Sequence, residues 1–114
     1  MSAVNVAEVY DRLIRLRGVS RQAVEGRFDV LHRYRALKVV PLEDPLAARA
    51  GELRAVHYHG VERPVSLADC AAAATAESLD TALATSDPKL IAMARDEGME
   101  VISLPSSSGR RTQR

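Results

Sequence analysis

Cysteine, tryptophan and the other aromatic residues are scarce in this sequence, and each shortage excludes a class of protein. The 114 residues contain one cysteine, Cys70, so a disulfide within the chain is impossible and a reducing compartment is expected. There is no tryptophan, and one phenylalanine and three tyrosines are the only aromatic residues. This composition argues against the stacking platforms of single-strand-binding proteins. A core must therefore be built from Ala, Val and Leu.

Long hydrophobic runs and an excess of charge of one sign are also missing. No run approaches the roughly 20 apolar residues of a membrane span, and the N-terminus lacks the basic and apolar regions of a signal peptide. We therefore expect a cytoplasmic protein without membrane contact. The net charge of +1 means that any nucleic-acid contact must come from local patches. A hydrophobic content of 46% and a length of 114 residues suit one folded domain.

Capping residues and apolar spacing predict helices that alternate with short strands. Since each strand is reached through a helix, the strands are expected to be parallel, with helices on both faces, in a three-layer α/β/α fold over residues 1–105. The tail, residues 106–114, is rich in Ser, Gly and Arg and is expected to be disordered. The predicted helices begin at the caps Ser2, Ser20, Asp44, Ser66 and Asp87, the second running to about Arg35, and the predicted strands are 37–42, 81–86 and 100–104.

Three acidic residues are the candidate functional side chains. Asp87 follows the predicted strand at 81–86, and Asp69 lies in the first turn of the helix that leads into that strand. Glu8 lies on the first helix, three residues after Asn5, so these two side chains share a helix face. Sites in parallel α/β sheets lie at the carboxyl ends of the strands. Three carboxylates meeting there would hold Mg²⁺ or Mn²⁺, which can polarise a phosphodiester and activate water. The pattern therefore indicates a nuclease site.

Each of these acids also has a purely structural explanation. Asp87 before Pro88 is a favourable helix N-cap, and Asp69 completes a capping box with Ser66. Glu8 can be a solvated charge on a surface helix. Spacing alone does not decide between ligands and caps.

Several other polar residues allow two interpretations. His57 and His59 flank Tyr58, but a zinc site would need further ligands nearby. Cys70, beside a run of alanines, is expected to be a small buried hydrophobic residue. The basic residues of the first two predicted helices either contact RNA phosphates or face solvent: Arg12, Arg15, Arg17, Arg21 and Arg27.

The order of the acidic motifs resembles that of the PIN-domain family, and most closely that of its VapC-like toxins. The matching segments are 5–9 (NVAEV), 67–69 (LAD) at the start of an alanine-rich helix, and 84–87 (ATSD) at a strand end. The resemblance extends over residues 2–105. It implies a Mg²⁺- or Mn²⁺-dependent endoribonuclease that acts on RNA, is blocked by a cognate antitoxin protein and forms a homodimer. The resemblance also implies that Glu8, Asp69 and Asp87 are catalytic metal ligands and that Asn5 and Thr85 are supporting residues.

One part of the family pattern has no counterpart in this sequence. The family begins with a central strand that carries a further Asp, whereas this chain starts after that strand, and Asp11 and Asp29 lie within predicted helices. We therefore expect a fold that lacks the usual first central strand, and an enzyme of impaired activity. The alternative is a catalytically inactive PIN remnant that acts as a protein-interaction module. A third possibility is an unrelated α/β binding domain whose acids are only helix caps.

Overall fold

The computed structural model describes residues 1–105 and divides the chain into two compact units. Unit 1 is Met1–Leu42 and unit 2 is Glu43–Arg114, of which residues 43–105 are described. The predicted tail at 106–114 lies outside the described residues. Over residues 1–105 no helix is long and apolar enough to cross a membrane.

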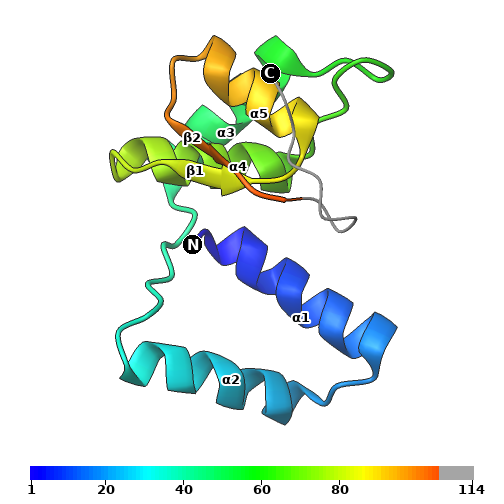
Figure 1. The fold of residues 1–114 in the computed structure, drawn as a ribbon, viewed down its shortest axis with the longest axis vertical. Coiled ribbons are helices and arrows are strands. Elements are labelled where there is room, and N and C mark those ends of the chain that lie inside the picture. Colours follow the sequence, from blue (N-terminus) through cyan, green and yellow to red (C-terminus); the bar gives the residue numbers. More distant parts are fainter. Residues whose placement is uncertain (106–114) are drawn as a thin grey trace. The chain divides into compact units, whose positions relative to one another are not determined.

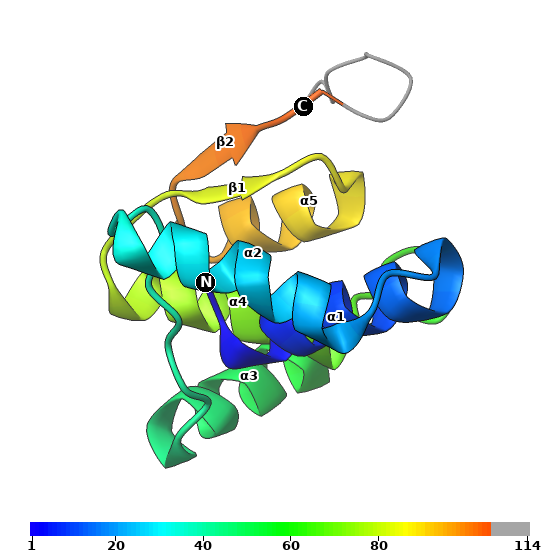
Figure 2. The ribbon, with the colours of Figure 1, turned by 90° about the horizontal axis from the view of Figure 1, so that it is seen from below.

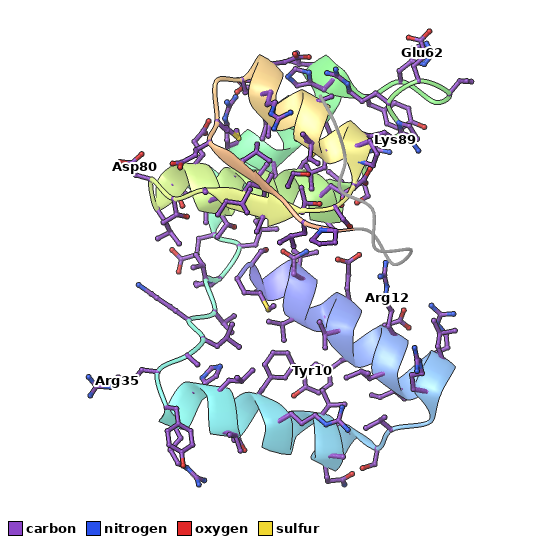
Figure 3. The ribbon with its side chains drawn as sticks, in the orientation of Figure 1. Tyr10, Arg12, Arg35, Glu62, Asp80 and Lys89 are labelled. Atoms are coloured by element: carbon purple, nitrogen blue, oxygen red, sulfur yellow. The ribbon has the colours of Figure 1, made fainter. Side chains whose placement is uncertain are left out.

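Unit 1 is a pair of helices, α1 (Ala3–Arg17) and α2 (Arg21–Arg33). The Ser2 hydroxyl accepts a hydrogen bond from the Val4 N–H and caps α1, and Gly18 ends the helix in the left-handed region at φ 64°. Both predicted ends of this helix are therefore confirmed. Tyr10 of α1, which is labelled in Figure 3, stacks on Phe28 of α2 with ring centroids 5.5 Å apart.

The predicted strand at 37–42 is wrong, because this segment forms only an isolated parallel bridge between Val40 and Ser2. The Val40 N–H donates to the Met1 carbonyl at 2.7 Å, and the Val40 carbonyl accepts from the Ala3 N–H at 2.9 Å. Pairing stops there because the partner segment turns into α1 at Ala3 and because Pro41 has no N–H to donate. An apolar, β-branched run is therefore not sufficient for a strand when its partner is this short.

Over residues 43–105, unit 2 forms three helices and a parallel two-stranded sheet (Figure 1). Leu83 lies opposite Val101 and Thr85 opposite Ser103, so the predicted α/β fold with parallel strands is confirmed, although both strands are shorter than expected. The predicted N-cap of the helix that begins near residue 44 is wrong by one residue, because Glu43 is the N-cap and Asp44 is already helical. Pro45 is compatible with either start, since proline is tolerated throughout the first turn of a helix. The elements are α3 (Asp44–His57), α4 (Leu67–Ser78), β1 (Leu83–Thr85), α5 (Pro88–Asp96) and β2 (Val101–Ser103).

The alanine-rich helix α4 lies at the centre of unit 2. It packs between the strands and α3, so the three form successive layers (Figure 2). Small side chains allow this close approach. The Cys70 thiol is buried and lies 4.0 Å from the sulfur of Met93 in α5, which confirms its predicted role as a buried hydrophobic residue. The buried residues of α4 are Cys70, Ala71, Ala73, Ala74 and Thr75.

Candidate active site

Asp69 occupies the third position of α4 and belongs to a complete capping box. Its N–H donates to the Ser66 hydroxyl at 3.0 Å, and its Oδ2 accepts from the Ser66 N–H at 3.1 Å. The capping box that the sequence predicts is thus confirmed. Among residues 1–105 the other carboxylate oxygen, Oδ1, has no hydrogen-bond partner, so one oxygen is fixed by the helix and one is open.

Asp87 follows β1 and caps α5, as predicted. Its Oδ1 accepts from the Lys89 N–H at 3.0 Å, and its own N–H donates to the Thr85 hydroxyl at 3.1 Å. The Thr85 hydroxyl therefore holds the backbone of Asp87 at the strand end. A supporting role of Thr85 in the site stays a prediction. Asp87 is half-buried and, like Asp69, uses only one carboxylate oxygen within residues 1–105.

The path of the chain brings Asp69 and Asp87 to the same end of unit 2. Leu79 comes ten positions after Asp69, which corresponds to about 15 Å along the helix at about 1.5 Å per residue. The chain then reverses at Asp80, where φ is 52°, and the extended segment to Asp87 returns about 20 Å at about 3.3 Å per residue. Asp80 and Lys89 mark the two ends of unit 2 in Figure 3, and Asp87 contacts the backbone of Lys89.

Glu8 lies on α1 and therefore belongs to unit 1. The Asn5 side-chain amide donates to the Glu8 Oε1 at 3.2 Å, which confirms that these two side chains share a helix face. Within neither unit, over residues 1–105, do three His, Cys, Asp or Glu side chains gather closely enough to hold a metal ion. The meeting of Glu8 with Asp69 and Asp87, one residue from one unit and two from the other, stays a prediction.

An ion-pair network that the sequence did not indicate joins the three helices of unit 2. The Arg49 guanidinium of α3 donates to Glu77 of α4 at 2.8 Å, to Glu97 at the end of α5 at 2.8 Å, and also to Glu52. The His57 Nε2 lies 2.6 Å from the Glu97 Oε2, and these hydrogen bonds, first from His57 and then from Arg49, lower the pKa of Glu97. Arg49 and Glu52 are three positions apart, but the pairs that join different helices are 28 to 48 positions apart, and no local pattern connects them.

The two histidines and the cysteine have structural partners. The Nδ1 of His57 lies 3.0 Å from the Arg63 guanidinium, and the Nδ1 of His59 accepts the Glu62 N–H at 3.0 Å. These contacts explain both rings without a zinc ion. Burial, together with the nearby Asp69 charge, raises the pKa of the Cys70 thiol to about 11, which argues against a nucleophilic thiolate near neutral pH.

Comparison with known protein families matches the PIN domain over residues 1–96, which includes Glu8, Asp69 and Asp87. A search of curated proteins finds no match. The family match covers most of the chain and confirms the resemblance first indicated by the acidic motifs. The chain therefore belongs to the PIN-domain family, which implies a nuclease and commonly a metal-dependent ribonuclease.

Proposed function

We propose that this protein is a divalent-metal-dependent endoribonuclease of the toxin–antitoxin type, similar to VapC-like toxins. RNA is the proposed substrate, and a cognate antitoxin protein and a second copy of the chain are the proposed partners. The observation that carries the proposal is the placement of Asp69 and Asp87 at one end of unit 2, where the strand β1 ends, in a chain of the PIN-domain family. The carboxyl end of a parallel strand is the usual position of a site in such sheets.

The donor set suits Mg²⁺ or Mn²⁺, which prefer carboxylate oxygens and keep several water ligands. Glu8, Asp69 and Asp87 would hold the ion. Each makes one local hydrogen bond through one carboxylate oxygen and leaves the second oxygen without a bond to any residue in 1–105. A bound ion would polarise the phosphodiester and lower the pKa of an attacking water.

The chain's own residues would hold these carboxylates in place. The Thr85 hydroxyl fixes the backbone of Asp87, and the Asn5 amide orients Glu8, so both are positioning residues rather than ligands.

Mn²⁺ binding separates ligands from helix caps. Asparagine is as good an N-cap as aspartate, so Asp87→Asn retains the cap of α5 and loses the charge. In Asp69→Asn the side-chain amide oxygen can still accept the Ser66 N–H, so the capping box keeps this hydrogen bond while the charge is lost. Titration calorimetry should show Mn²⁺ affinity falling by about tenfold or more in each variant, because even indirect support of a metal ligand is worth about 10- to 100-fold. The matched control is Asp80→Asn, which lies at the opposite end of unit 2 (Figure 3) and whose positive φ asparagine tolerates.

The same variants decide between the enzyme and the interaction module. If Asp69→Asn and Asp87→Asn bind Mn²⁺ as the parent does, the acids are only caps and the nuclease proposal fails. The inactive, protein-binding alternative would then be preferred. If both lose Mn²⁺ and RNA cleavage while their circular dichroism spectra remain unchanged, the metal site is supported.

A further inference from the structure

The two units of this chain carry opposite charge. Unit 1 has eight Lys and Arg against four Asp and Glu, a net charge of +4. Unit 2 has eight Lys and Arg against eleven Asp and Glu, a net charge of −3. The overall charge of +1 therefore hides a strongly basic helix pair, and an anionic partner would be attracted to unit 1.

A hollow of about 670 Å³ lies where α1 turns into α2, and we name it the arginine hollow. This volume falls within the range of about 300–1,000 Å³ that is typical of ligand pockets. Its apolar part comes from α1 and from the turn, and Leu16 is 62% exposed there. Its lining residues are Arg12, Leu13, Leu16, Arg17, Val19 and Arg27.

The arginines of unit 1 differ in whether a carboxylate already holds them. Arg15 makes two hydrogen bonds of 3.0 Å to Asp11, and Arg21 donates to Glu25 at 2.9 Å. Arg12, Arg17 and Arg27 are exposed, and among residues 1–105 they have no ion-pair or hydrogen-bond partner. The arginine hollow is thus lined by three arginines that no carboxylate among residues 1–105 holds.

We propose that the arginine hollow binds the phosphodiester backbone of single-stranded RNA, with Arg12, Arg17 and Arg27 on phosphate groups. The inference rests on the proposed ribonuclease function, which supplies the substrate class. Guanidinium groups bind phosphate in a bidentate manner and are favoured wherever phosphate is recognised. The apolar floor offers contact to the faces of bases, which only an unpaired strand exposes. Because aromatic platforms are scarce, the binding is mainly electrostatic and depends on salt.

The test measures binding of a fluorescein-labelled oligouridylate of twelve nucleotides by fluorescence anisotropy. EDTA is present, so neither metal binding nor cleavage contributes. The hollow variant carries Arg12→Gln, Arg17→Gln and Arg27→Gln. The control carries Arg33→Gln, Arg35→Gln and Lys38→Gln, which removes the same charge from unit 1. Figure 3 shows Arg35 at the end of α2 that is far from the turn joining α1 to α2.

We expect the hollow variant to bind the RNA at least about tenfold more weakly than the control variant. Three lost phosphate contacts should also reduce the slope of log affinity against log salt by about 2, since each contact to a single strand contributes about 0.7. Because all six substituted side chains are exposed, both variants should keep the parent's circular dichroism spectrum.

Three results would overturn the inference. The first is that the hollow variant binds RNA as the parent does. The second is that the control variant loses as much affinity as the hollow variant. The third is that polyglutamate binds the hollow while RNA does not, which would identify an acidic protein as the ligand. Cleavage of the same RNA with Mn²⁺ is measured separately. If RNA binding depends on the hollow but no cleavage occurs, this inference stands and the proposed function fails. If the RNA is cleaved but its binding does not depend on the hollow, the proposed function stands and this inference fails.

Discussion

Replacing Arg49 by methionine tests how the helices of unit 2 are held together. The Arg49 side chain is 28% exposed, and it contacts carboxylates on α3, on α4 and at the end of α5. Methionine keeps the apolar stem that packs against these helices and removes the charge and the hydrogen bonds. The substitution therefore isolates the electrostatic part of the contact.

The size of the effect follows from how exposed each partner is. Glu52 is 62% exposed and should contribute almost nothing, and Glu77, at 38%, about 0.5 kcal/mol. Glu97 is 24% exposed and is held by charged hydrogen bonds, so it should contribute about 1 kcal/mol. We expect Arg49→Met to lower the free energy of unfolding by about 1.5–2 kcal/mol at pH 7, measured by urea denaturation.

The loss should depend on pH in a defined direction. Hydrogen bonds from His57 and Arg49 lower the pKa of Glu97 in the folded chain. A carboxyl group with a lowered pKa stabilises the fold above its unfolded value of about 4.3, and this contribution is lost as the pH falls through the folded value. The difference between the parent and Arg49→Met should therefore be largest near pH 7 and shrink below about pH 4.

Arg54→Met is the matched control on the same helix. The Arg54 Nε donates to the Val65 carbonyl at 3.1 Å, and its guanidinium lies 4.4 Å from the centre of the Tyr58 ring. One partner is a backbone carbonyl and the other is the face of an aromatic ring, so neither contact involves a carboxylate, and the destabilisation of this variant should be the same at pH 7 and pH 4. An Arg49→Met loss that is equally independent of pH would refute the electrostatic reasoning.

Two further predictions concern the core of unit 2. Leu53 of α3 is fully buried, so Leu53→Ala should lower the free energy of unfolding, measured in urea, by about 2–5 kcal/mol. Val56 on the same helix is 67% exposed, so Val56→Ala should change this free energy by no more than about 0.5 kcal/mol. Equal losses in the two variants would contradict the packing. Burial raises the Cys70 pKa to about 11, so Ellman's reagent at pH 8 should react with this thiol only in urea, and rapid reaction of the folded chain would show that α4 is not packed as described.

Local capping chemistry made most helix ends predictable from the sequence. Ser2, Gly18 and the Ser66–Asp69 box act within a few residues of themselves, so their hydrogen bonds follow from spacing alone. The cap of α3 was misplaced by one residue because Pro45 fits more than one position in the first turn. Errors of this kind are small and leave the element order intact.

Properties that depend on distant partners could not be read from the sequence. The segment at 37–42 has the composition of a strand, but strand formation requires a paired neighbour, and only Val40 finds one. The contact of Arg49 with Glu97 joins positions that are 48 residues apart. The same limit applies to the candidate site. Asp69 and Asp87 reach one end of unit 2 because the short turn at Asp80 joins their elements, whereas Glu8 belongs to unit 1.

The caps at Asp69 and Asp87 have a consequence for any ligand that approaches them. Each side chain is already locked in one rotamer by a backbone N–H at about 3 Å, from Ser66 and from Lys89. An approaching cation would therefore meet oxygens whose orientation is set during folding, and little conformational freedom would remain to be lost on coordination. The rigidity of this acidic end of unit 2 is thus a property of the apo chain.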